Sequence, residues 1–595
     1  MFLKRLVEYA EEEIELPPTL YEKRPVRYIV ALGQDGRLLS PEPIDTADPD
    51  DKTGKNGTPR YVPSVQRTSG VKPLLLASNS EYTLGLAREK SKPQRVAHCH
   101  AAYLEQLERC VQRTQLPAVA AVLRFLRSKP LEQLRLPADW KPDATITFTV
   151  DGVFVVDLPE VQAFWAEEND PAADPNRPAS VMQCLICGER RPVLERLQSK
   201  IKGVPGGQTS GTSLISANAP AFESYGQSAS LIAPTCPRCG ERFTQGLNRL
   251  LASRSNHISL GNAVLVFWTR GKTEFDLFGL LSAPEPEEVA ALVQAARRGG
   301  PLPAIDHTAF YAAVLTGSGG RAVVRDWIDT TVGDVKKHLA RWFAWQAVVG
   351  PDGRPARPLG VYSLAAATVH DAKKNPPPPP VARALWRCAL SNTPLPGSLL
   401  WQAVARNMAE RKVSSTRAAL IKAVLASRAS MERTSEDPLD KEDEMVELDE
   451  NSPSAAYRCG RLLAVIEEVQ RLAIPGIKAT VVDRFYGTAS TAPASVFSRL
   501  LRGAQPHLAK LERDKPGAYR ALQQRLQDIL AGVSAFPKTL SLEEQGLFAL
   551  GYYHQRAFDR AQAMAAAERR RAQQATDMGL ADLAEVPLTT EEKED

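Results

Sequence analysis

The chain has 595 residues, too many for one hydrophobic core, so we expect three or four domains. Its composition, 43% hydrophobic and 24% charged, is that of a globular protein, and a net charge of +5 over this length does not by itself indicate nucleic-acid binding. The N-terminus lacks the apolar core of a signal peptide, and no apolar run reaches the ~20 residues that span a bilayer. We therefore expect a cytoplasmic protein with no membrane partner.

Strand and helix patterns are mixed in the first part of the chain. Residues 26–32 and 263–268 are apolar runs typical of buried strands, and residues 145–150 alternate as a half-exposed strand would. Asp151-Gly152 suits the positive φ angles of a two-residue hairpin turn that leads back along residues 153–156. Apolar residues recur at helical spacing near the N-terminus and over residues 94–128, which predicts two amphipathic helices. This part is therefore expected to be an α+β domain.

Two Cys-x-x-Cys pairs, each followed by Gly, predict a metal site. The two-residue spacing lets both thiolates of a pair face one tetrahedral ion, and Gly permits a tight turn behind them. In a cytosolic protein this pattern favours zinc over disulfides, the alternative being two redox or chance pairs. The predicted ligands of one structural Zn²⁺ are Cys184, Cys187, Cys236 and Cys239. The remaining cysteines are expected to be buried apolar residues; they are Cys99, Cys110, Cys388 and Cys459.

The segment between the two pairs is rich in Gly, Ser, Thr, Asn and Gln. It carries Lys200 and Lys202, followed by a Gly-Gly-Gln tripeptide that ends at Gln208. Amide side chains can bond base edges, and lysines can bind phosphates, so the segment is a candidate nucleic-acid contact. The candidates are Lys202, Gln208, Thr209, Ser210 and Asn218. One alternative is a solvated connector, and another is a peptidyl-tRNA hydrolase, because release factors also use Gly-Gly-Gln.

A basic stretch follows the five prolines at 376–380, which predict a stiff spacer. Residues 381–433 contain nine Lys or Arg against two Glu. We expect Arg406, Arg417 and Lys422 to line a phosphate groove, the alternative being an ordinary solvated helix face.

The C-terminal part reads as almost purely helical. Residues 434–450 contain nine acidic residues against one Lys, which predicts an exposed or disordered loop before it. Helices are expected near 494–512, 517–533 and 541–575. Ser541 and Glu544 form a capping box that starts the last one.

These patterns predict a multidomain α+β fold with five parts. They are an N-terminal α+β domain (1–180), a zinc-bound insertion (181–245), a continuation of the α+β domain (246–375), a basic helical region (376–475) and a C-terminal helical bundle (476–595). We expect no catalytic site, because four thiolates would leave no open position on the zinc. In addition, Gly271-Lys272-Thr273 lacks the leading Gly of a phosphate-binding loop.

Long stretches of the chain resemble the large subunit of the type I-C CRISPR Cascade surveillance complex. The matching stretches are LVEYAEE at the N-terminus, RTSGVKP at 67–73, IKGVPGGQTSG and AFESYG around Gln208, DRFYG at 483–487, and the run from Phe536 to Gln555. The resemblance implies a non-catalytic subunit that recognises the PAM in target double-stranded DNA, helps to open the duplex into an R-loop and recruits a separate helicase–nuclease.

The resemblance also implies partners and a second contact segment. The partners are crRNA, target DNA, the backbone and 5′-handle-binding subunits, and small subunits, one of which the C-terminal bundle itself resembles. Besides the Gly-Gly-Gln segment, a basic residue that precedes short polar ones is a candidate for PAM contact. These residues are Lys72, Ser78, Asn79 and Ser80. A zinc-stabilised scaffold that does not touch nucleic acid is the remaining alternative.

Overall fold

The computed structural model forms two compact units. It describes residues 2–14, 18–47, 57–64, 70–88, 91–169, 180–197, 200–217, 219–297, 306–432 and 445–577. One unit comprises Met1–Lys202 with Ser213–Arg249, and the other comprises Gly203–Thr212 with Leu250–Asp595. The mixed α+β class predicted from the sequence is confirmed, while the finer divisions at 180, 245, 375 and 475 stay predictions.

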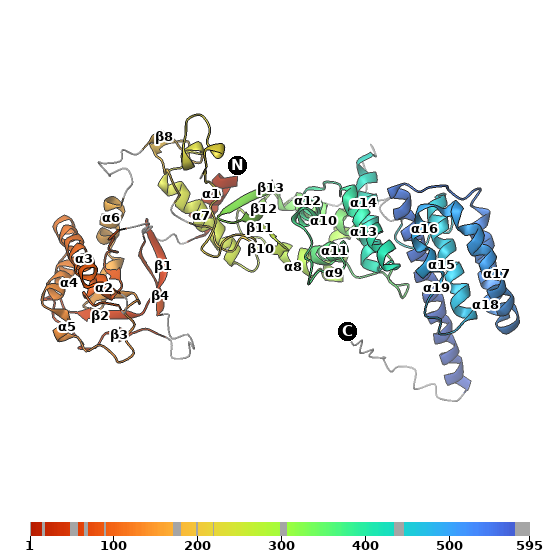
Figure 1. The fold of residues 1–595 in the computed structure, drawn as a ribbon, viewed down its shortest axis with the longest axis horizontal. Helices are drawn as coiled ribbons and strands as arrows, with labels where there is room; N and C mark the ends of the chain where they lie inside the picture. Colours follow the sequence, from red (N-terminus) through yellow and green to blue (C-terminus); the bar gives the residue numbers. More distant parts are fainter. Residues whose placement is uncertain are drawn as a thin grey trace. The chain divides into compact units, whose positions relative to one another are not determined.

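The first unit is built around a five-stranded sheet (Figure 1). Its strands are β2 (Tyr28–Leu32), β3 (Ile44–Asp45), β5 (Ala77–Ser78), β6 (Ile146–Val150) and β7 (Val153–Phe154). Strand β6 lies beside β2 in parallel, with helices between them in sequence. A separate antiparallel pair joins β1 (Tyr21–Val26) to β4 (Thr58–Pro63).

Strand β6 corrects one prediction and confirms another. All five of its residues are buried, so the expected alternation with an exposed face is wrong. The reason is that the strand lies within the hydrophobic core of this unit, where Thr147 Oγ1 donates to Leu76 O at 2.9 Å and can therefore be buried beside apolar residues. The hairpin turn is confirmed, because Asp151 and Gly152 have φ angles of 49° and 81°.

The helix predicted over residues 94–128 is two helices, α3 (Pro93–Thr114) and α4 (Pro117–Arg127). Gln115 ends α3 in the left-handed region at φ 52°, and Pro117 occupies the first turn of α4. The other helices of this unit are α1 (Phe2–Glu13), α2 (Ser80–Thr83), α5 (Pro130–Gln133), α6 (Pro159–Glu168) and most of α7 (Pro237–Ala252), and its last strands are β8 (Val181–Gln183) and β9 (Arg190–Pro192).

The second unit begins with a four-stranded antiparallel sheet in sequence order. Its strands are β10 (His257–Leu260), β11 (Ala263–Thr269), β12 (Ala309–Ser318) and β13 (Arg321–Thr331). Helices α8 (Leu277–Ser282) and α9 (Pro286–Arg297) lie between strands in the chain, and α10 (Val332–Gln346) follows the sheet. One continuous hydrophobic core runs from the sheet into the helices that follow it.

The rest of the second unit is helical (Figure 1). The helices are α11 (Val361–Ala366), α12 (Pro379–Ser391), α13 (Gly397–Glu410), α14 (Ser415–Glu432), α15 (Ala455–Ala473), α16 (Val481–Thr491), α17 (Phe497–Asp514), α18 (Pro516–Ala531) and α19 (Leu542–Asp577). The three predicted C-terminal helices are therefore confirmed. The capping box is also confirmed, since Ser541 N–H donates to Glu544 at 2.7 Å and Glu544 N–H donates to Ser541 Oγ at 3.3 Å.

Two linking segments differ in part from expectation. The last two prolines of 376–380 form the first turn of α12, where a missing N–H costs nothing, so only the first three act as a spacer. Of the acidic stretch 434–450, positions 434–444 lie outside the described residues. Its described end is anchored, because Val349 N–H donates to Val446 O at 2.7 Å and Arg461 donates to Glu450 O at 2.9 Å.

Candidate metal centre and nucleic-acid segments

The four predicted zinc ligands come together in the first unit. Cys184 and Cys187 lie on the turn after β8, Cys236 precedes α7, and Cys239 lies in the first turn of α7. Their four sulfur atoms all lie within 4.8 Å of one another. Tetrahedral thiolates ~2.3 Å from a zinc ion would be about 3.8 Å apart, so the site fits the ion after a small contraction.

The electrostatics of the four thiols also favour a cation. Burial raises the pKa of Cys184, but main-chain N–H groups of Cys187, Cys236 and Ile186 outweigh burial and lower it to about 7. Burial and the neighbouring thiols raise the pKa of Cys239 instead. Negative charge on the neighbouring sulfurs therefore opposes the ionisation of Cys239, and a dication at the site would offset this repulsion.

The two glycines behind the cysteine pairs serve different purposes. Gly188 has φ 78°, so the predicted tight turn is confirmed there. Gly240 lies inside α7, where a Cβ atom would approach Leu197 Cδ2 to 2.9 Å. Glycine is needed at position 240 because Leu197, from the segment after the first pair, packs against the helix there. The tight turn predicted behind the second pair is therefore wrong.

Helix α1 supports the metal centre, although the sequence did not indicate this. Gly246 of α7 lies against α1, since a Cβ atom there would approach Leu6 O to 2.8 Å. Glu11 also pairs with Arg238 at 3.1 Å and with Arg242. Arg238 stands between Cys236 and Cys239, so α1 braces the second cysteine pair directly.

The Gly-Gly-Gln segment is held by the tip of the β12–β13 hairpin within the second unit. Gly317 N–H donates to Pro205 O at 2.8 Å, and Gln208 N–H donates to Gly319 O at 2.9 Å. The contact needs glycine, because a Cβ atom at Gly206 would lie 2.8 Å from Gly317 O. Residues leading into the segment are fixed by Asn248, which accepts from Lys202 N–H at 2.8 Å.

The segment therefore has a source of order besides the cysteine pairs that flank it in the sequence. Its own hydrogen bonds join it to a hairpin of the second unit, to which residues 203–212 also belong. The side chains of Lys202, Gln208, Thr209 and Ser210 are exposed, whereas Asn218 lies outside the described residues. The exposed polar side chains and the fixed backbone together can present a preorganised set of donors and acceptors.

The second predicted contact segment is only partly accessible. Lys72 is exposed, but Ser78 and Ser80 are buried, which leaves Lys72 as the accessible member of this predicted contact segment. Ser80 Oγ accepts a hydrogen bond from Trp140 Nε1 at 3.2 Å. Asn79 is half-buried and precedes α2, and its main-chain oxygen accepts from the N–H of Thr83, the last residue of that helix. These hydrogen bonds stabilise the junction between β5 and α2.

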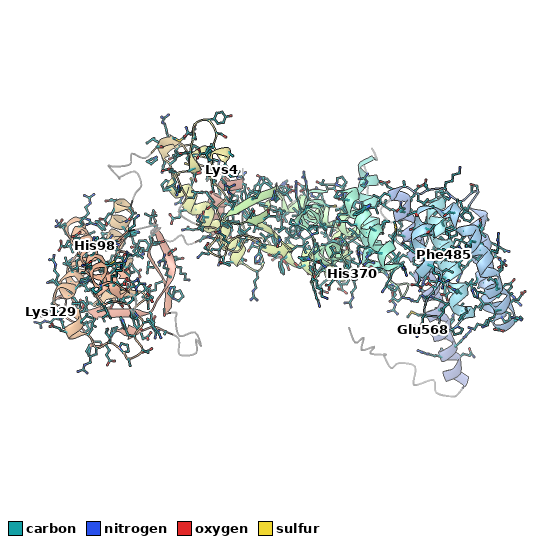
Figure 2. The ribbon with its side chains drawn as sticks, in the orientation of Figure 1. Lys4, His98, Lys129, His370, Phe485 and Glu568 are labelled. Atoms are coloured by element: carbon teal, nitrogen blue, oxygen red, sulfur yellow. The ribbon has the colours of Figure 1, made fainter. Side chains whose placement is uncertain are left out.

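The predicted phosphate groove is corrected in the same way. Lys422 is 0% exposed, and its ammonium donates to Ala344 O at 2.8 Å. Arg417 is 8% exposed and pairs with Glu410, which also binds Arg406 at 2.5 Å. Burial raises the pKa of Glu410, but the two guanidinium groups outweigh it and lower the pKa to about 2. His370, labelled in Figure 2, adds a fourth group at 3.4 Å from Glu410.

Arg417 and Lys422 therefore stabilise the helical core. Their charged groups are bonded to the Glu410 carboxylate and to main-chain oxygens. Arg406 keeps a quarter of its side chain exposed and remains a prediction as a phosphate contact. No sequence signal distinguished Arg417 and Lys422 from surface cations, because their partners Ala367 and Ala344 are main-chain groups far along the chain.

The fold defines a multidomain α+β protein in which four clustered cysteines could hold a metal ion. The model of the family described as CRISPR-associated protein (Cas_Csd1) matches residues 3–558, so the chain belongs to this family. The resemblance to the large subunit of type I-C Cascade is thereby confirmed, and the protein is a subunit of a CRISPR-associated complex. No curated protein matches the chain. In the described parts of the chain, no helix has the length and apolar character needed to cross a bilayer.

Proposed function

We propose that this subunit recognises the PAM in target double-stranded DNA, without catalysis of its own, and starts R-loop formation. In a crRNA-guided complex, base pairing reads most of the target and protein reads a short duplex motif, so one subunit must present a rigid reading surface. The observation that carries the proposal is the Gln208–Ser210 tip, whose side chains are exposed while its backbone is bonded to Gly319.

The proposal assigns different roles to the exposed side chains. Gln208 contacts a base edge, because an amide can make two hydrogen bonds to adenine, while Thr209 and Ser210 offer hydroxyl groups beside it. Lys202 and Lys72 bind phosphates and position the duplex without reading its sequence. The partners are crRNA, the backbone, 5′-handle-binding and small subunits, and a helicase–nuclease that the complex recruits after the duplex has opened.

We further propose that one Zn²⁺ is bound by Cys184, Cys187, Cys236 and Cys239. When bound, it would fix the lobe that contains Lys202 and would act as a structural ion, because four thiolates fill its coordination sphere. Metal analysis of the purified protein should give about one zinc per chain. A content well below one would contradict this assignment.

Duplex binding by the assembled complex tests the reading role. Gln208→Ala should weaken binding to PAM-containing duplex by roughly tenfold, the cost of one base contact, and should leave PAM-less duplex almost unchanged. Lys202→Ala should weaken both duplexes and reduce the slope of log affinity against log salt by about 0.9. Gln294→Ala, at an exposed glutamine of α9, serves as the matched control and should change neither.

The outcomes separate the proposal from its alternatives. Equal losses on the two duplexes for Gln208→Ala and Lys202→Ala would remove Gln208 from the readout. No loss for Lys202→Glu would favour a scaffold that does not touch DNA. A release-factor-like hydrolase is disfavoured, because the family match extends over residues 3–558 rather than over one tripeptide.

A further inference from the structure

Strand β10 leaves one edge of the second unit's sheet open. It is the first strand in the order β10-β11-β12-β13 and pairs only with β11. Phe267 N–H donates to Asn256 O at 2.9 Å, and antiparallel pairs alternate, so the main-chain groups of His257 and Ser259 point away from β11. Within the described residues, these outward groups have no hydrogen-bond partner.

A cavity of about 350 Å³ lies beside this open edge. Its apolar wall consists of Phe278 and Leu281 from α8 with Val361 and Tyr362 from α11. Tyr362 is 53% exposed and Phe278 is 36% exposed, which is unusual for large rings in a folded core. The cavity is therefore an accessible apolar pocket next to unpaired strand hydrogen-bonding groups.

The rim of the cavity is basic. Arg254 borders it, is exposed, and makes no described ion pair. His257 also borders it, and its Nδ1 lies 2.7 Å from Ser253 O. A carbonyl only accepts, so this contact places the ring proton on Nδ1 and leaves Nε2 of the neutral tautomer as an acceptor. The complementarity of the rim to a carboxylate therefore comes from Arg254.

We propose that an extended peptide segment from another subunit of the complex adds to β10 as a fifth strand. Its main chain bonds the outward groups of His257 and Ser259, an apolar side chain enters the cavity, and a carboxylate near that side chain pairs with Arg254. This interface is independent of the PAM-reading role proposed above.

The occupant follows from the chemistry of the edge. Outward donors and acceptors that repeat every second residue match an extended peptide, whereas a nucleotide has no such repeat. Strand β10 also lacks the Lys, Pro or bulge that commonly blocks pairing at open edges. The basic rim selects a segment with an acidic residue over a basic one.

Photo-crosslinking in the purified, assembled complex tests the interface. A benzophenone amino acid at position 362 should crosslink one sister subunit, within a segment that contains an apolar and an acidic residue. Ser259→Pro removes the outward N–H but keeps the bonds to β11, because the ring lies on the solvent side of the edge. This variant should lower the crosslink yield about tenfold, because it removes one main-chain hydrogen bond to the added strand and weakens the adjacent one.

Ser259→Ala is the matched control, since it removes the same hydroxyl but keeps the N–H, and its yield should stay within about twofold. Arg254→Glu should lower the yield about fivefold at low salt and less at high salt, which keeps the test valid if the proline variant misfolds. Equal yields for all variants would overturn the proposal. So would a crosslink to a second copy of this chain, to DNA or RNA, or to no partner.

Discussion

Two stretches carry polar and basic residues that the sequence predicted to contact nucleic acid, and they differ in how far those side chains are exposed. The stretch 203–212 is short and uncharged; its backbone is bonded to the β12–β13 hairpin, and the side chains of Gln208, Thr209 and Ser210 face solvent. The stretch 406–422 is basic, but Arg406, Arg417 and Lys422 lie against Glu410 and main-chain oxygens in the helical core. The candidate side chains of the first stretch are therefore exposed, whereas those of the second are mostly buried.

The difference shows that charge density is a weak guide to a nucleic-acid surface. A buried cation is stable only when a carboxylate or carbonyl replaces its water, and then it has no capacity left for phosphate. An exposed amide held by its own backbone needs no such compensation and remains free for a ligand. The four predictions below test this contrast, in order of decreasing expected effect.

The largest effect should come from the metal centre. Cys184→Ser should lower the zinc content to well below one per chain, because structural zinc contributes roughly 10 kcal/mol to the folding of its site. Hydrogen exchange should then show lost protection over 184–197 and 229–239. Residues 204–208 should keep most of their protection, since they bond the β12–β13 hairpin, which belongs to the same unit as they do. Equal loss in both regions would mean that the metal alone orders the Gly-Gly-Gln segment.

Removal of the buried ion pair should affect stability rather than DNA binding. Arg417→Ala removes one of the two guanidinium partners of Glu410 and also the donor to Ala367 O, and the two losses together should cost about 3 kcal/mol. Thermal unfolding should detect this loss, whereas Lys412→Ala, at an exposed neighbouring cation, should cost less than about 0.5 kcal/mol. Duplex affinity per folded molecule should be unchanged. A loss of duplex affinity with an unchanged melting temperature would indicate instead that Arg417 contacts phosphate.

Acid should destabilise the helical core through His554. Burial and then the Lys422 ammonium lower the pKa of His554 to about 3, from an ordinary value of 6.5. The unfolded chain therefore binds a proton first as the pH falls, so the stability from this group is full above pH 6.5 and is lost toward pH 3. At pH 5 the loss is about 2 kcal/mol relative to pH 8.

Urea unfolding at both pH values measures this loss, and His554→Asn should abolish it while keeping an acceptor for Tyr457. Lys422→Met should reduce it, because the neighbouring positive charge that opposes protonation is gone. An unchanged acid loss in Lys422→Met would show that Lys422 does not lie as a cation beside His554. That result would contradict the burial of Lys422. It would also contradict the contrast between the two stretches.

The smallest effect should be local to the Gly-Gly-Gln segment. Gly207→Ala would place a Cβ atom against Thr212 Cγ2, a buried methyl group, and should cost about 1 kcal/mol and displace the segment. Gly319→Ala introduces strain at φ 57° but meets no atom within 4 Å, so it is the control without a clash. PAM-containing duplex should bind several-fold more weakly to Gly207→Ala only. Similar losses for both variants would indicate backbone strain rather than displacement.

Features with a short-range cause could be predicted from the sequence. The cysteine spacing predicted the four-cysteine cluster, because two thiols separated by two residues can face the same ion. The Asp151-Gly152 turn and the Ser541–Glu544 capping box were correct for the same reason, because their hydrogen bonds close within a few residues. The family was indicated by long matching stretches rather than by any physical pattern.

Features that depend on distant partners could not be predicted. The burial of Lys422 depends on Ala344, which is 78 residues away, and the role of Gly206 depends on Gly317 in another hairpin. The complete burial of β6 depends on distant segments too, since Thr147 donates to Leu76 O, 71 residues away. A sequence states which groups are polar and how they repeat, but the free energy of a polar group depends on whether water or protein surrounds it.

The sequence by itself thus indicated the four-cysteine cluster, most helices and strands, and the family. Only the tertiary structure decided which candidate side chains face solvent and that the Gly-Gly-Gln segment is bonded to the β12–β13 hairpin. The physical reason is that ligand spacing and capping are properties of neighbouring residues, whereas exposure is set by what the rest of the chain packs against them.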